Sequence, residues 1–198
     1  GPGFHPFSHA KSEASASIDF LIAATTFCAG NQQVKAKPDG NLYLSGYSQG
    51  AHAALATHKE LEKNPVPGLT LRKTVAGSGA YSLSFIQKRF LFNDPEYPNP
   101  SFLPYLILGY QSVYGNLYSN LNQVFVSPYK TDMPGYFDGT KTVEEIDSYL
   151  PVKWQDMFKP NYLWKIRYSY FHPVNIALRK NDLINWKPGA DLHLYYCN

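Results

Sequence analysis

A five-residue segment, residues 46–50 (GYSQG), matches the pattern G-x-S-x-G and constrains the fold more than any other feature of the sequence. The apolar run at residues 41–45 that precedes it is typical of a buried strand. The alanine-rich stretch at residues 49–63 that follows it predicts a helix, which ends before Pro65. The chain is therefore expected to place a serine on a sharp turn between a strand and a helix.

Each residue type in this segment has a physical reason. Gly46 and Gly50 lack a Cβ, so the strand and the helix can approach closely around the turn. Strained backbone angles at Ser48 would lift its hydroxyl above the edge of the sheet, and the backbone N–H of Gln49 would donate to the oxyanion formed when the serine attacks a carbonyl. The pattern thus predicts Ser48 as a nucleophile and Gln49 as an oxyanion donor. The alternative is a tight turn in which Ser48 only caps the helix.

The elements around this segment predict an α/β fold with a parallel sheet, because strand, helix and strand alternate. Apolar residues at helical spacing predict a helix over residues 11–29. Further strands are expected at residues 69–75 and 192–197.

After about residue 82 the alternation stops, and prolines and aromatic residues become dense. We interpret this stretch as a helical cap inserted after the strand that follows the serine, with one helical face over residues 110–121 and a short helix near residues 143–150. The expected organisation has three parts, which are core residues 1–83, cap residues 84–172 and a return to the core at residues 173–198.

A nucleophilic serine needs a histidine base that is oriented by a carboxylate, and in this type of fold both follow the serine in sequence. His52 and His58 follow Ser48 on the same predicted helix, where they point away from its hydroxyl and are expected to be surface or packing residues. His172 ends the predicted cap and His193 lies inside the last strand, so neither is well placed to act as the base. Two aspartates precede that strand instead of following it, Asp182 and Asp191. We therefore expect the acid and the base of a triad to lie outside this chain.

Charge and composition argue against several other classes of protein. The net charge is only +3 and the basic residues are scattered, so nucleic-acid binding is not expected. No apolar run approaches the roughly 20 residues that cross a bilayer, so stable membrane insertion is not expected. His5 and His9 have the i, i+4 spacing that would put both rings on one helical face, but no third ligand lies nearby in the sequence. We expect no metal and no cofactor.

Three segments together resemble a known family. They are residues 46–50, residues 3–10 (GFHPFSHA) and residues 181–186 (NDLINW), and the resemblance spans nearly the whole chain. The sequence resembles bacterial secreted α/β-hydrolases related to the secretory lipase and esterase group. This resemblance implies a partial α/β-hydrolase fold, a secreted or periplasmic location and a small-molecule ester as substrate.

The resemblance also places the catalytic Asp a few residues after the strand that matches residues 192–197, with the histidine later still. We therefore interpret the chain as a fragment of a longer enzyme, inactive alone, whose fold a partner segment would complete. Seven aromatic residues of the predicted cap are candidates for lining an acyl pocket, although the core of the cap itself is the stronger interpretation for any one of them. They are Phe85, Phe92, Phe102, Tyr110, Tyr114, Phe125 and Trp154.

The activity expected from these observations is hydrolysis of carboxylic esters, of lipase or esterase type, through an acyl-enzyme on Ser48. The G-x-S-x-G segment does not separate this activity from that of a serine peptidase or an acyltransferase of the same fold. A third alternative is a binding protein that kept the fold and lost its chemistry.

Overall fold

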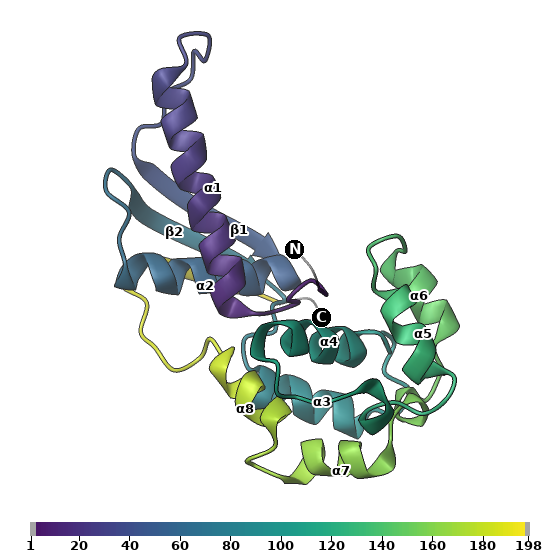
Figure 1. The fold of residues 1–198 in the computed structure, drawn as a ribbon. Helices are drawn as coiled ribbons and strands as arrows, with labels where there is room; N and C mark the ends of the chain where they lie inside the picture. Colours follow the sequence, from purple (N-terminus) through teal and green to yellow (C-terminus); the bar gives the residue numbers. More distant parts are fainter. Residues whose placement is uncertain (1–2, 197–198) are drawn as a thin grey trace. The chain divides into compact units, whose positions relative to one another are not determined.

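The computed structural model describes residues 3–196, which form two compact units (Figure 1). The first, here called the core unit, comprises residues 8–82 and 181–198. The second, here called the helical unit, comprises residues 1–7 and 83–180. Among the helices within residues 3–196, none has the length and apolar character needed to cross a membrane.

The core unit is built on three parallel strands, β1 (Asn41–Tyr47), β2 (Thr70–Gly77) and β3 (Asp191–Tyr195), in the order β1-β2-β3. Helix α2 (Gln49–Lys63) connects β1 to β2, as expected for parallel neighbours. The predicted α/β fold with a parallel sheet is confirmed. Of the strand predicted at residues 192–197, Cys197 lies outside the described residues.

One face of this sheet is covered and the other is open. Alternate residues of β1 and β2 point toward α2, where Ala51 and Leu55 pack with Ala76 of β2 in a small apolar core. The opposite face exposes Tyr43, Tyr47 and Val75, and no described element of the core unit covers it. Parallel sheets are normally covered on both faces, so this core unit presents only half of such an arrangement.

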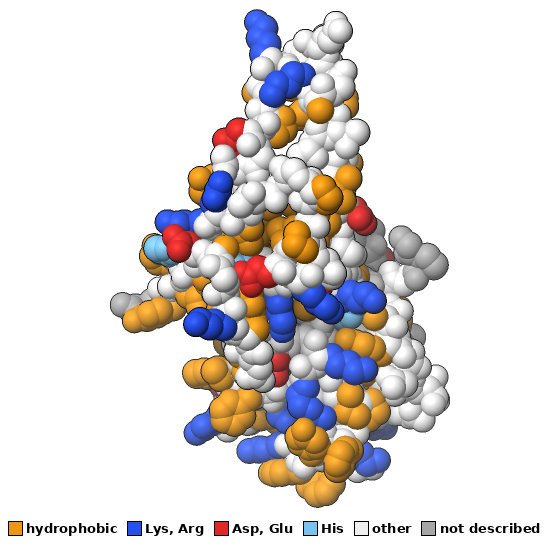
Figure 2. Space-filling model, turned by 90° about the vertical axis from the view of Figure 1, so that its left-hand side faces the viewer, with side chains coloured by type: hydrophobic (Ala, Val, Ile, Leu, Met, Phe, Trp, Pro, Cys, Tyr) orange, Lys and Arg blue, Asp and Glu red, His pale blue; other side chains and the backbone are white. Residues whose placement is uncertain are grey.

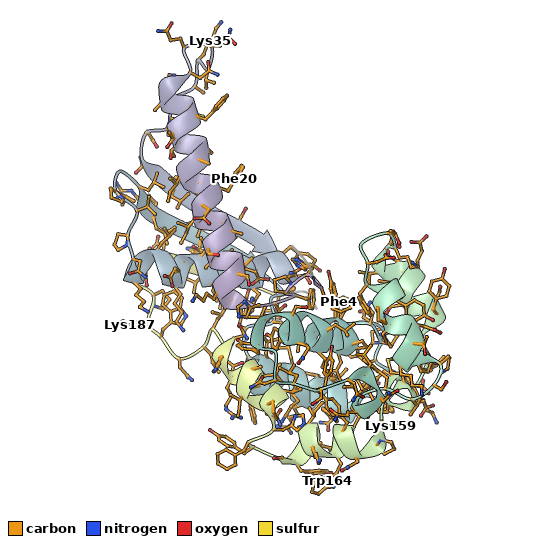
Figure 3. All side chains as sticks on the ribbon, in the orientation of Figure 1. Phe4, Phe20, Lys35, Lys159, Trp164 and Lys187 are labelled. Carbon is orange, nitrogen blue, oxygen red and sulfur yellow. The ribbon has the colours of Figure 1, made fainter. Side chains whose placement is uncertain are left out.

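Helix α1 (Ala10–Gly30) packs on α2 and is capped by His9, whose imidazole accepts the backbone N–H of Ser12. The apolar face expected for this helix is only partly buried in the structure, and Ala14 is its one buried residue within the described chain. Phe20 projects away from the helix and is 72% exposed (Figure 3). Because α1 has 21 residues and α2 has 15, part of α1 extends past its neighbour.

The helical unit contains six α-helices and three short helical turns within residues 83–180, and no strand among the described residues. Its elements are η1 (Leu83–Gln87), α3 (Lys88–Asn93), α4 (Phe102–Tyr114), η2 (Leu121–Gln123), α5 (Tyr129–Tyr136), α6 (Val143–Tyr149), η3 (Trp154–Met157), α7 (Pro160–Tyr168) and α8 (Pro173–Lys180). The unit extends eight residues past the predicted cap because α8 packs on η1 and α4.

Two helix predictions for this unit can be compared with the structure. The short helix expected near residues 143–150 is present as α6, which Thr142 and Glu145 begin with a reciprocal capping box. The helical face expected over residues 110–121 is wrong beyond Tyr114, where α4 ends. Gly115 follows with φ 69°, a left-handed conformation that stops a helix.

The aromatic residues of the helical unit form much of its own core. Tyr110, Phe125 and Trp154 are fully buried, which matches the stronger interpretation given to them above. Phe85, by contrast, is 63% exposed. The first described residues belong to the same core, since Phe7 stacks on Tyr105 with ring centroids 4.9 Å apart.

The junction between β1 and α2 depends on Gly46 but not on Gly50. A Cβ built on Gly46 would lie 2.0 Å from the carbonyl oxygen of Gly50, whereas a Cβ on Gly50 would meet nothing within 4 Å. The expectation that both glycines make room is therefore correct for Gly46 and wrong for Gly50.

We predict that Gly46→Ala lowers the free energy of unfolding by about 3 kcal/mol, because backbone and not a flexible side chain blocks the new methyl group. Gly50→Ala is the matched control and should raise it by up to about 1 kcal/mol, since alanine is favoured in a helix. Urea denaturation of both variants measures the difference. Equal effects of the two substitutions would contradict the steric role of Gly46.

Candidate active site

Ser48 occupies a strained turn between β1 and α2. Its backbone angles are φ 54° and ψ −118°, a region that residues with a side chain rarely adopt. The backbone N–H of Ser48 donates to the carbonyl of Gly77 at 2.9 Å, and its carbonyl accepts the N–H groups of Ala51 and His52. The strained conformation is therefore held from β2 on one side and from the first turn of α2 on the other.

The side chain of Ser48 is exposed at the carboxyl end of β1. Among the described residues it makes no hydrogen bond that caps α2, so the interpretation of Ser48 as an ordinary helix cap is not supported. The carboxyl ends of neighbouring strands lie beside it, since Tyr47, Gly77 and Tyr195 are consecutive partners across the sheet. In open α/β sheets, ligands bind at this edge.

Gln49 is the first residue of α2. The first amides of a helix point outward from its N-terminus, where the helix dipole favours negative charge. The side chain of Gln49 turns toward α1, and its Nε2 donates to Oε1 of Glu13 at 3.2 Å. The role of the Gln49 amide as an oxyanion donor stays a prediction.

Glu13 and His52 form a buried pair directly behind the turn. Nδ1 of His52 lies 2.6 Å from Oε2 of Glu13, and the two side chains are 0% and 8% exposed. Nε2 of His52 lies 3.0 Å from the carbonyl oxygen of Asn181, so both ring nitrogens face acceptors. The pair therefore links α1 to α2 four residues after Ser48.

Asn181 connects the returning chain to both helices. Its side-chain oxygen accepts the backbone N–H of Ala10 at 2.9 Å, which satisfies the start of α1, while its carbonyl binds His52. Trp186, at the other end of the same segment, packs edge-on against the ring of His58 at 5.0 Å between centroids. Residues 181–186 therefore contact α1 through Asn181 and α2 through both Asn181 and Trp186.

The histidines of α2 are packing residues and not surface residues. His52 and His58 are both fully buried, and Nε2 of His58 is paired with Oε1 of Glu62 at 2.9 Å. His193 lies in the middle of β3, opposite Val75. These positions are held within helices and strands and not on a loop beyond the last strand.

The remaining polar candidates are likewise in structural positions. Asp191 begins β3, opposite Lys73 and four residues before the carboxyl end of the strand. Asp182 lies before that strand and is half-buried. His172 belongs to the helical unit, where it stacks edge-on against Tyr162, and burial lowers its pKa.

The alternative in which His5 and His9 share a helical face is not realised, because α1 begins only at Ala10, close to the predicted start at residue 11. His9 instead caps this helix through Nδ1. Burial lowers the pKa of His9, which favours the neutral imidazole that can accept the amide hydrogen of Ser12. Among residues 3–196, no three His, Cys, Asp or Glu side chains gather as metal ligands would.

Known structures resemble this chain over 98% of its length. The rice cell wall degrading esterase LipA from Xanthomonas oryzae is 29% identical, with a TM-score of 0.85 in a ligand-bound form and 0.86 in another crystal structure. A candidate hydrolase from Legionella pneumophila is 27% identical, with a TM-score of 0.86. The chain spans about half the length of these proteins, 51% in each case. No protein-family model and no curated protein sequence matches it.

We predict that Ser48→Gly raises the free energy of unfolding by about 1 kcal/mol, because glycine adopts φ 54° without strain. Ser45→Gly, three residues earlier in β1, is the control and should lower it by about 1 kcal/mol, since Ser45 lies in ordinary extended backbone. Thermal and urea unfolding of the two variants would show the contrast. A loss of stability in both variants would mean that Ser48 is not strained.

We also predict that Glu13→Ala lowers the free energy of unfolding by about 3 kcal/mol, because it leaves the buried ring of His52 without its acceptor. Glu13→Gln keeps a polar group at the same place and should cost about 1 kcal/mol. Asp19→Ala on the exposed side of α1 should change stability by less than about 0.5 kcal/mol. If Glu13→Ala and Asp19→Ala change the free energy of unfolding equally, the Glu13–His52 pair does not stabilise the fold.

Proposed function

We propose that this chain, which has the α/β-hydrolase fold of the esterases it resembles, carries the nucleophile of a serine-dependent carboxylic ester hydrolase. The observation that supports this most is the backbone of Ser48, with φ 54° and ψ −118°, at the end of a parallel strand. Strained backbone of this kind persists only where the surrounding structure holds it in place, and such residues cluster at active sites and ligand-binding sites. Here it leaves a hydroxyl exposed beside the N-terminus of α2.

The proposed reaction begins with attack of Ser48 Oγ on the carbonyl carbon of an ester. The oxygen that becomes negative is stabilised by the backbone N–H of Gln49, at the positive end of α2. Collapse of the tetrahedral intermediate breaks the carbon–oxygen bond, the base returns the Ser48 proton to the leaving alcohol, and an acyl group remains on Ser48. Water then attacks this ester and releases the acid.

The base that takes the proton of Ser48, and the carboxylate that orients it, are assigned to residues outside this chain. Three of the histidines that follow Ser48 support this assignment, since two are buried in α2 and one lies within β3. The fourth, His172, packs edge-on against Tyr162. We further propose that an additional segment covers the open face of the sheet and completes the fold. Tyr43 and Tyr47, each 67% exposed on that face, support this proposal.

An ester substrate is favoured over a peptide because the solved relatives include a protein described as a cell wall degrading esterase. The helical unit would act as the cap that shapes the acyl pocket. The candidates for this role are its exposed aromatic side chains, including Phe85. Tyr110, Phe125 and Trp154 are buried in the core of the unit. A serine peptidase, an acyltransferase and a silent binding protein of this fold remain the alternatives to be tested.

The test uses a protein that contains this chain together with the segments that supply the base and the acid. Ser48→Ala should lower the rate of hydrolysis of short and long acyl esters by at least about 10³-fold, because it removes the attacking oxygen. A serine-reactive phosphonate should label the unchanged protein at Ser48. The matched control is Ser45→Ala, which should keep both the activity and the label.

Three outcomes would contradict parts of this proposal. Cleavage of peptides without cleavage of esters would replace the ester assignment by a peptidase. A folded protein that neither labels nor hydrolyses would indicate a binding protein. Labelling that survives Ser48→Ala would place the nucleophile at another residue.

A further inference from the structure

One segment of the chain, most of it in the helical unit, has basic residues that no acidic residue balances. Residues 157–181 contain five basic residues and no acidic residue. The rest of the chain has thirteen basic and fifteen acidic residues, so its net charge is −2 while that of the whole chain is +3. The basic residues of this segment are Lys159, Lys165, Arg167, Arg179 and Lys180.

Helix α7 within this segment has two contrasting sides. Tyr162, Leu163 and Ile166 are buried in the core of the helical unit. Trp164 and Tyr168, one helical turn apart, are 60% and 62% exposed, with ring centroids 5.6 Å apart. Figure 3 shows Trp164 projecting outward from α7.

Basic residues flank these rings. At 100° per residue, Lys165 and Arg167 fall on either side of the line through Trp164 and Tyr168, and both are exposed. The guanidinium of Arg167 lies 5.5 Å from the centre of the Tyr168 ring. The outward side of α7 is therefore a pair of aromatic rings bordered by cations.

The turn between α7 and α8 continues the same pattern. Tyr170 is 64% exposed and Phe171 is 79% exposed. Arg179, in the last turn of α8, stacks over the Tyr170 ring at 3.8 Å and donates from Nη2 to the Tyr170 carbonyl at 2.9 Å. These contacts fix the turn, so its rings are held outward and do not fold back onto the unit.

We define the α7–α8 surface as these exposed aromatic and basic residues, Trp164, Lys165, Arg167, Tyr168, Tyr170 and Phe171, with the basic end of α8. We propose that it docks peripherally on a membrane that contains anionic lipids. Figure 2 shows the molecule from the left-hand side of Figure 1, and hydrophobic and basic side chains are interspersed over the lower part of this view.

The chemistry of the surface fits a membrane with anionic lipids. Tryptophan and tyrosine rings are favoured at the boundary between lipid headgroups and acyl chains, where one part of the ring meets water and the other hydrocarbon. Arginine and lysine beside them pair with anionic phosphate groups. Rings that project from a helix and a turn need a partner that accommodates their shape. A lipid surface deforms around them, whereas a protein partner would need a pocket of matching shape. Docking of this kind is independent of Ser48 chemistry and of any membrane-crossing segment.

The test measures binding of the chain to phosphatidylcholine vesicles with and without about 30% phosphatidylglycerol, by sedimentation. We expect binding only to the anionic vesicles, with its loss at high salt. Trp164 fluorescence should be quenched by brominated acyl chains, because this ring enters the interface. Trp164→Phe should abolish that quenching yet keep binding, since Trp154 is fully buried and Trp186 is half-buried.

Matched variants separate this surface from nonspecific attraction. Lys165→Gln with Arg167→Gln should weaken vesicle binding by about fivefold per charge removed. Lys130→Gln with Lys153→Gln removes the same charge from exposed positions elsewhere in the helical unit and should change binding less than twofold. Circular dichroism checks that each pair leaves the fold unchanged.

Several results would overturn the proposal. They are equal binding to neutral and anionic vesicles, equal loss of binding in the two pairs of variants, and binding without quenching of Trp164. Preferential binding to an anionic polysaccharide or to nucleic acid under the same conditions would replace the membrane by that polymer. Self-association of the chain that Trp164→Ser with Tyr168→Ser abolishes would assign the surface to a second copy instead.

Discussion

The close approach of β1 and α2 at Gly46 is the constraint on which the candidate site depends. Because the Gly50 carbonyl occupies the space where a Cβ at residue 46 would lie, the chain can turn from strand to helix within a single residue. That residue is Ser48, which takes the strain of the turn in its own backbone angles. A looser junction would relax the strain and would also let the hydroxyl turn back to cap the helix.

The strain at Ser48 persists because several separate contacts oppose its relaxation. Gly77 holds its backbone N–H from β2, and the first turn of α2 binds its carbonyl. Behind that turn, the buried Glu13–His52 pair fixes α2 to α1, and Asn181 joins the same pair to the returning chain. The segments that meet here are far apart in the sequence, so the turn is stabilised by the tertiary fold of the whole core unit and not by local preference.

Helix α7 of the α7–α8 surface has one side buried in the core of the helical unit and one side exposed. In α7 the Tyr162 ring is buried with Leu163 and Ile166 in the core of the helical unit, while the rings of Trp164 and Tyr168 are exposed and remain available to a partner. Composition alone does not separate these two groups. The helical phase, together with the cations that border the outer rings, makes the distinction.

The parts of the fold that local chemistry specifies were predicted well. The strand before Ser48, the helix after it and the parallel neighbour that follows come from short-range patterns of apolar residues, glycine and proline, and these elements are present. The predictions that failed required knowledge of what each residue touches. Gly50 has open space around it, and α4 ends before a left-handed Gly115.

The candidate site divides in the same way. The sequence by itself determined where the turn lies, which serine it presents and why a glycine precedes it, because sterics within five neighbouring residues set these features. Only the tertiary structure decided that His52 pairs with Glu13, that Asn181 joins them and that Ser48 is held by Gly77. Those partners are 39, 129 and 29 residues apart in the chain, and such pairs depend on how helices and strands dock, which no local pattern of residues encodes.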